Sequence, residues 1–203
     1  MMRRPQENRF KASGERCVRE SCQGMTRRTF LRMSCIAAVP FLSSSLTFSN
    51  ALALLEGKKS LSFFNTHTGE TLAATYWESG EYLSQPLADI NYILRDHRTD
   101  QVIPIDLDLL DLLNAIRMKI RTQQPFHIIS GYRSPKTNSL LCKLNRGVVE
   151  NSLHMCGKAA DIRLPGCDLS SLRGAAMDLK RGGVGFYPRS DFIHVDVGRV
   201  RYW

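Results

Sequence analysis

The sequence predicts one α+β domain, in which a small, mainly antiparallel sheet is flanked by helices. Short strand-like segments alternate with helix-like segments through the C-terminal half of the chain. Two earlier strand-like segments are separated by a polar turn, which is typical of an antiparallel hairpin. The chain has 203 residues, 43% of them hydrophobic, and can therefore build one ordinary domain with a core. We expect this domain to span residues 54–203 and to leave no room for a second one.

The first half of the domain is expected to contain a hairpin and two helices. Pro86 favours a helix start, and apolar side chains then recur at helical spacing. The next helix has the clearest periodicity, and either Asp106 or Asp108 could cap its N-terminus. The expected elements are strands 61–65 and 70–77, a turn at 66–69, and helices 87–98 and 106–123.

The patterns in the second half are shorter. Pro135 again favours a helix start, and the Gly182-Gly183 pair indicates a turn. The expected elements are strand 126–130, a helix from 135 to about 145, loop 147–153, strand 158–164, helix 168–180, and strands 184–187 and 192–197.

The positive charge is concentrated at the N-terminus. The chain carries a formal net charge of +9, and residues 1–53 hold nine Lys/Arg against three Asp/Glu. Only +3 remains for the domain, which argues against a nucleic-acid-binding surface there. A mild positive charge would suit an anionic polymer outside the cytoplasm.

The N-terminal residues resemble an export signal. We expect residues 1–24 to be disordered or an upstream extension, with Met25 as a candidate true start. Residues 25–53 match a twin-arginine signal peptide, because Arg27-Arg28 precedes a short apolar stretch and small residues that suit signal peptidase. The stretch is too short and too polar for a stable membrane span. The alternative is an amphipathic or buried helix with a chance arginine pair.

The six cysteines do not suggest a zinc knuckle. None of them forms a closely spaced pair, and only three lie beyond residue 53. The spacing leaves open a disulfide between Cys156 and Cys167, because spacing alone does not establish the required geometry.

Three residues could together bind a metal ion. His154 and Asp161 are seven positions apart, and Asp161 has apolar neighbours, among which an unpaired carboxylate is costly. On a strand, His194 and Asp196 would share the face opposite Ile193. Two imidazoles and one carboxylate leave a position for water, as in zinc hydrolases. We therefore interpret His154, Asp161 and His194 as a Zn2+ site for peptide-bond hydrolysis.

Each member of this set also has a structural interpretation. A single histidine is more often a hydrogen-bonded structural residue than a ligand, and Asp161 could instead pair with Arg163 or Arg133. The remaining histidines lack candidate ligands as neighbours, and we interpret them as turn, helix-end and strand residues, respectively: His67, His97 and His127.

Several motifs together resemble one known family. They are Ser152-x-His154-x-x-Gly157-x-Ala159-x-Asp161, Phe192-x-His194-x-Asp196, Ser130-Gly131-Tyr132-Arg133-Ser134, and segments 64–70 and 182–190. This set resembles the murein endopeptidase K (MepK) family, which is related to zinc D-Ala-D-Ala peptidases of the hedgehog/LAS-type fold. The resemblance covers residues 25–203. It implies that fold and zinc ligation by His154, Asp161 and His194.

Two carboxylates are candidates for the group that takes a proton from the attacking water. Asp191 stands three residues before His194, where the related peptidases place an acidic residue, but it could be a solvated loop residue. Asp196 could instead orient a ligand imidazole. We favour Asp191 as the base and Asp196 as the orienting group.

Arg133 is a candidate for stabilising the oxyanion of the tetrahedral intermediate. It follows a predicted strand, and the resemblance implies that it lies beside the zinc ion. The alternative is a salt bridge to Asp161 or to a surface carboxylate. Weaker candidates for substrate contacts are Ser152, Tyr187 and Arg189.

These expectations describe a periplasmic zinc endopeptidase that hydrolyses peptide cross-links of peptidoglycan during cell-wall growth. The alternatives are a D,D-carboxypeptidase that trims stem peptides, and a non-catalytic module that keeps a zinc site and binds peptidoglycan. The expected partners are stem peptides, with no nucleic acid.

Overall fold

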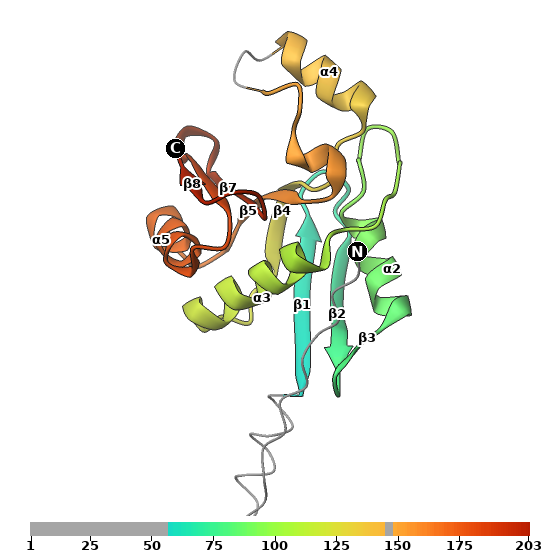
Figure 1. Cartoon of the computed structure of the whole chain (residues 1–203), viewed down its shortest axis with the longest axis vertical. Coiled ribbons are helices and arrows are strands. Elements are labelled where there is room, and N and C mark those ends of the chain that lie inside the picture. Colours follow the sequence, from blue (N-terminus) through green and yellow to red (C-terminus); the bar gives the residue numbers. More distant parts are fainter. Residues whose placement is uncertain (1–56, 145–147) are drawn as a thin grey trace, which may run out of the picture. The chain divides into compact units, whose positions relative to one another are not determined.

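The computed structural model describes residues 57–144 and 148–203 (Figure 1). The predicted N-terminal extension and twin-arginine signal, at 1–24 and 25–53, lie outside the described residues. Within the described ranges, none of the helices combines the length and the apolar character needed to cross a membrane.

The strands of the described residues form a single mixed sheet in the order β3-β2-β1-β4-β5-β7-β6-β8. Pairs β1–β4 and β6–β8 are parallel, and the other neighbours pair antiparallel. The expected small, mainly antiparallel sheet is therefore corrected to an eight-stranded mixed one. The bounds are β1 (Lys58–Asn65), β2 (Thr71–Glu78), β3 (Glu81–Tyr82), β4 (Phe126–Ser130), β5 (Ala159–Arg163), β6 (Gly183–Tyr187), β7 (Phe192–Asp196) and β8 (Arg201–Tyr202).

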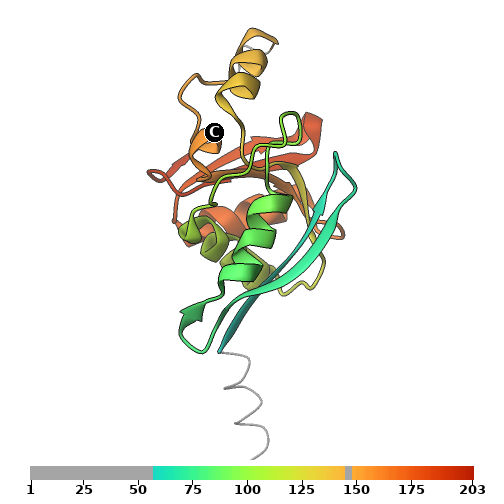
Figure 2. The same cartoon turned by 90° about the vertical axis from the view of Figure 1, so that its right-hand side faces the viewer.

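Among the residues that the structure describes, three helices pack against the sheet, and one lies apart from them. Helix α2 contacts β2, α3 contacts β1, and α5 contacts β6 and β7 as well as α3. Helix α4 is separated from these three helices in both views (Figures 1 and 2). The helices are α2 (Ser84–Ile93), α3 (Leu107–Ile120), α4 (Pro135–Leu144) and α5 (Leu169–Leu179), and two short 3-10 turns are η1 (Leu153–Cys156) and η2 (Pro188–Ser190).

Apolar side chains explain where these elements pack. Helix α3 begins at the cap that the sequence suggests, because the Asp106 carboxylate accepts a hydrogen bond from the backbone of Asp108. The apolar side chains of α3 that face the sheet pack against alternate residues of the strands and form one core with them. Burial of apolar surface is the main favourable contribution to the stability of a fold. Buried members include Leu61, Phe63, Ile90, Leu109, Leu113, Ile116, Phe126, Ile128, Ile162, Leu172, Ile193 and Val195.

The predicted helix 87–98 differs most from the observed one. Helix α2 starts earlier, at Ser84, and ends at Ile93. The next residues leave the helix because their polar groups bond elsewhere: the carbonyl oxygen of Leu94 accepts from the backbone of Tyr132, and the carboxylate of Asp96 accepts from that of Ser134. Tertiary hydrogen bonds therefore override the helical pattern in this segment.

Strands β5 and β7 present one apolar and one polar face. Their antiparallel register places Asp161 opposite His194 and Ile162 opposite Ile193. Because side chains alternate along a strand, the isoleucines enter the core while the aspartate and the histidine share the other face. This polar face carries the candidate site.

Candidate metal centre

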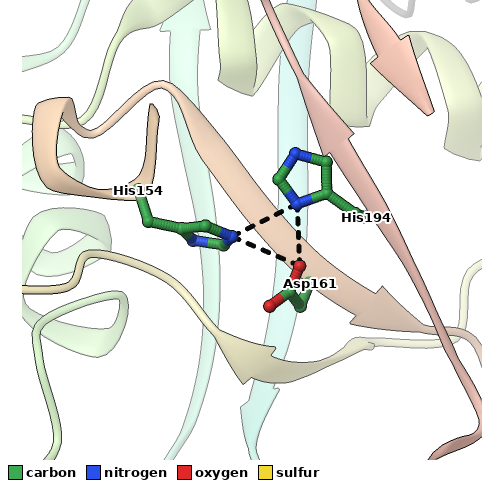
Figure 3. A group of neighbouring side chains, drawn as sticks. All are labelled: His154, Asp161 and His194. Carbon is green, nitrogen blue, oxygen red and sulfur yellow. Dashed lines mark hydrogen bonds and ion pairs between the residues drawn. The ribbon is translucent and has the colours of Figure 1, made fainter. Parts of the chain in front are cut away.

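The three predicted ligands converge on one point (Figure 3). One ligand atom from each of His154, Asp161 and His194 lies within 4.8 Å of the others. Asp161 Oδ1 is 2.9 Å from His194 Nδ1 and 3.3 Å from His154 Nε2, and the two ring nitrogens are 3.2 Å apart. The residues come from η1, β5 and β7, so segments far apart in the sequence build the group.

The short turn η1 fixes His154. The side chain of Ser152 accepts a hydrogen bond from the His154 backbone and caps the turn. Gly157 ends it in the left-handed region, at φ 66°. A Cβ atom there would lie 2.7 Å from the carbonyl oxygen of Pro104, so only glycine fits. These contacts explain the serine and the glycine of the motif.

The outer nitrogen of each ring has an oxygen acceptor. His154 Nδ1 lies 2.7 Å from the carbonyl oxygen of Gly131, and His194 Nε2 lies 3.0 Å from Asp196 Oδ2. If these nitrogens carry the ring protons, His154 Nε2 and His194 Nδ1 direct lone pairs toward Asp161. Three electron-pair donors at such short distances need a positive charge between them. The donor set and its outer hydrogen bonds fit a zinc ion.

The charges around the centre support the same conclusion. Burial alone would raise the pKa of Asp161, but the two histidines hold it well below its usual range, so the carboxyl stays ionised. Burial lowers the pKa of His154 and favours the neutral imidazole. Burial would also lower the pKa of His194, but its bonds to Asp161 and Asp196 raise it. A bound cation would replace the proton that His194 otherwise attracts.

Arg133 lies against the centre. Its guanidinium donates to Asp161 Oδ2, and its Nε donates to Ser130 Oγ at 2.8 Å. The salt bridge considered as an alternative is therefore present, and Arg133 also lines the cavity over the centre. Its role toward an oxyanion stays a prediction.

Asp196 is buried and fully engaged. Its carboxylate accepts from the backbone of Gly183 and Gly198, from two nitrogens of Arg201, and from His194. Five donors saturate its lone pairs and help to hold its pKa well below the usual range, although burial opposes them. Its geometry is that of a group that orients His194.

Asp191 has a different environment. It sits between η2 and β7 in the left-handed conformation, with its side chain 62% exposed. Its carboxylate lies 2.7 Å from Arg163 Nη1, and it is not among the residues that line the cavity. Whether Asp191 acts as the base stays a prediction.

A cavity of about 1050 Å³ lies over the three ligands and extends to both sides of them. On one side it reaches His67 in the β1–β2 turn, and on the other it reaches Tyr187 and Trp203. The Trp203 indole donates to the Tyr187 hydroxyl, and its ring centre lies 5.4 Å from that of His194. Polar and aromatic surfaces thus flank the centre.

The remaining candidates fall outside the ligand group. Cys156 is exposed and does not join it, and the described cysteines Cys142, Cys156 and Cys167 are all free, so the considered disulfide is not formed. Of the other histidines, His67 lines the cavity and stacks on His97, with ring centres 3.8 Å apart.

Some contributors were not identified from the sequence. The Gly131 carbonyl has no side-chain signature, and Trp203 and Arg201 belong to a terminal segment too short to show periodicity. The Gly-Tyr-Arg motif did point to the loop that carries Gly131 and Arg133.

Comparison with known proteins identifies the family. The profile of the family described as "Peptidoglycan L,D-endopeptidase MepK" matches residues 55–203. The chain is 41% identical to the peptidoglycan L,D-endopeptidase MepK of Escherichia coli (strain K12) over 143 residues, which are 70% of this chain and 79% of the relative. It is 36% identical to the probable peptidoglycan L,D-endopeptidase MepK of Haemophilus influenzae over 180 residues, which are 87% of this chain and 95% of the relative. The chain belongs to the peptidoglycan L,D-endopeptidase MepK family.

Proposed function

We propose that this protein is a zinc-dependent peptidoglycan endopeptidase that hydrolyses cross-links between stem peptides. The single observation that carries the proposal is the convergence of His154, Asp161 and His194 inside a large cavity, in a chain of this family. Bound zinc would polarise the scissile carbonyl and make a water molecule nucleophilic near neutral pH.

The residues of the chain prepare the site for that chemistry. His154, Asp161 and His194 would hold the ion, and the Gly131 carbonyl and Asp196 keep the two imidazoles in the required orientation. Arg133 brings a positive charge to the same place and is suited to developing negative charge on the substrate oxygen.

Asp191 is the carboxylate that we assign to proton transfer. Asp196 already accepts five hydrogen bonds, so it has no free lone pair for a further proton donor. Asp191 bonds only to Arg163 among the described residues and is exposed. The role requires its side chain to leave Arg163 and turn toward the substrate.

An internal cross-link is the preferred substrate over a chain end. The curated relatives are named L,D-endopeptidases, which suggests the bond between two diaminopimelate residues. A cavity that extends to both sides of the ligands could hold a stem peptide on either side of the scissile bond. A D,D-carboxypeptidase needs room for only one residue beyond that bond. Opening cross-links would allow new strands to enter the growing wall.

Residues 25–53 would direct the protein to the periplasm by the twin-arginine route, where its substrate lies. This route tolerates a folded protein with metal already in place. Processing of the signal can be measured from the mass of the protein recovered from the periplasm.

The function is tested by product analysis on defined cross-linked muropeptides, with and without a chelator. We expect loss of the cross-linked dimer, abolished by chelation and by His154→Ala. Release of free D-Ala alone would indicate a carboxypeptidase instead. If the zinc-loaded protein binds muropeptides without cleaving any, the non-catalytic binding module is the correct function.

A further inference from the structure

The segment that follows α2 lies at the edge of the cavity. Arg98 is exposed and lines the cavity, as does His67 in the neighbouring turn. Among the described residues, Arg98 has no carboxylate within salt-bridge distance, whereas Arg133 is paired with Asp161. Arg98 thus brings an unneutralised positive charge to this side of the metal centre.

A buried carboxylate fixes the backbone beside both arginines. Asp96 is only 1% exposed, and it accepts from the backbone nitrogen of Arg98 at 2.9 Å and from that of Ser134 at 2.8 Å. Burial would raise the pKa of Asp96, but hydrogen bonds from Thr137 and Ser134 hold it well below its usual range. Burying an ionised carboxylate costs free energy unless hydrogen bonds compensate for the lost water. The charge-assisted hydrogen bonds of Asp96 therefore hold the segment of Arg98 and the loop of Ser134 firmly together.

Two further contacts fix the same segment to the β1–β2 turn. Arg95 is buried and forms a double hydrogen bond with Glu70, at 2.8 Å and 3.1 Å. The ring of His97 stacks on that of His67. Arg98 therefore extends from a rigid backbone, which is what a specific binding contact requires.

The charges of Arg98 and Arg133 both act on His97. Burial, followed by the charge of His67, lowers the pKa of His97 to about 4; the two arginines act in the same direction, and Asp96 opposes them. Both arginines thus act on the same region of the cavity edge, where an anionic group of a ligand would be favoured.

The other side of the centre differs. There, Arg201 is engaged by Asp196, and the surface is formed mainly by aromatic rings such as Tyr187 and Trp203. Arg199 is exposed, does not line the cavity, and forms no salt bridge among the described residues. It provides a matched control for Arg98.

We propose that Arg98 forms a carboxylate-binding subsite on the β1–β4 side of the metal centre, while Arg133 stays paired with Asp161. Its ligand is a carboxylate of the stem peptide, carried either by diaminopimelate or by a terminal alanine. The inference rests on the proposed function, because it names the part of that substrate which the cavity recognises. The carboxylate that binds beside Arg98 would set the direction in which the peptide lies in the cavity.

The test measures binding separately from hydrolysis. The full-length protein is treated with a chelator, and a cross-linked muropeptide dimer is titrated into it by calorimetry. Three forms of the dimer are compared: unmodified, amidated at the diaminopimelate carboxyl, and amidated at the terminal carboxyl. The variants are Arg98→Ala, Arg98→Lys and the control Arg199→Ala, and thermal unfolding establishes that each is folded.

We expect Arg98→Ala to weaken binding of the unmodified dimer by roughly 10-fold, because an exposed charge-assisted hydrogen bond is lost. Amidation of the carboxyl that Arg98 recognises should weaken binding to the wild type by a similar factor. Arg98→Ala should then have no further effect on that amidated dimer. The amidated dimer that the wild type binds more weakly therefore identifies which carboxyl is recognised. Arg98→Lys should restore part of the affinity, and Arg199→Ala should change it less than about 2-fold.

The inference is overturned if Arg98→Ala weakens all three dimers equally or none of them, if Arg199→Ala shows the selectivity instead, or if the wild type binds no dimer. Hydrolysis is measured in parallel with the zinc-loaded protein. If the protein shows the expected binding pattern but hydrolyses no dimer, the endopeptidase function is refuted, whereas the carboxylate subsite is still supported.

Discussion

His194 Nε2 lies 3.0 Å from Asp196 Oδ2, and this carboxylate is fully buried. The same carboxylate also accepts hydrogen bonds from Arg201 and from two backbone N–H groups. Asp196 therefore connects the ring orientation of His194 to the ends of β6 and β7 and to β8. One side chain supports both the metal centre and the C-terminal strands.

Replacing Asp196 with alanine should reduce stability and metal affinity together. The change removes the acceptor of two backbone N–H groups and of one Arg201 nitrogen, and a buried donor left unsatisfied costs about 1–3 kcal/mol. Loss of the outer bond of His194 should weaken metal binding about 10- to 100-fold. Urea unfolding and metal titration measure the two effects. The control Asp178→Ala removes an exposed carboxylate paired with Lys119 and should shift stability by less than about 0.5 kcal/mol. Equal stability of the two variants would contradict this role of Asp196.

The protein should bind one zinc ion per chain through the three converging ligands. His154→Ala removes one donor and should abolish stoichiometric binding, whereas His127→Ala changes a histidine of β4 outside the group and should leave binding intact. Elemental analysis after dialysis gives the stoichiometry. Chelation should also lower the unfolding temperature of the wild type, because an ion that binds only the folded state stabilises it. An unchanged zinc content in His154→Ala would exclude this site.

Asp191→Ala should lower kcat about 100- to 10,000-fold if this carboxylate transfers the proton. Zinc content and muropeptide affinity should remain those of the wild type, since the side chain is exposed and does not contact the ligands. The matched variant is Arg163→Ala, which removes the ion-pair partner and keeps the carboxylate. It should change kcat by only a few-fold. A similar modest change in Asp191→Ala would assign proton transfer to another group.

The stability of the domain should depend on His97 in acid. Burial, followed by the charge of His67, lowers the pKa of His97 to about 4, whereas an unfolded histidine titrates near 6.5. Between these values the unfolded chain binds the extra proton, so stability is full above about pH 6.5 and falls as the pH decreases toward 4. His97→Phe keeps the stacked ring and removes the titration, so its free energy of unfolding should fall less than that of the wild type over this range. Urea unfolding at several pH values measures the difference, and parallel curves would refute it.

The site was more predictable than the sheet, for physical reasons. His194 and Asp161 stand out in the sequence because polar ligand types interrupt strands whose neighbours are apolar. The alternation of a strand then places His194 and Asp196 on one face, as the structure shows. Sequence spacing could not separate the orienting carboxylate from the base. The geometry of Asp196 now gives it an orienting position.

Other features depend on contacts that no local pattern encodes. Asp96 lies within a run of helical periodicity, yet it leaves the helix because its carboxylate binds the backbone of another loop. The parallel pairing of β1 with β4 joins strands separated by two helices. Strands β3 and β8 have two residues each, which is too short for a periodic signal.

The facing positions of Asp161 and His194 make the centre sensitive to strand register. If β7 slipped by one residue along β5, His194 would move to the core face and Ile193 would enter the polar cavity. A chain with that error would lack both a closed core and a complete ligand set. Metal retention would therefore report correct strand pairing, and a bound ion would act as a template that favours the native alignment of these strands over its nearest competitor.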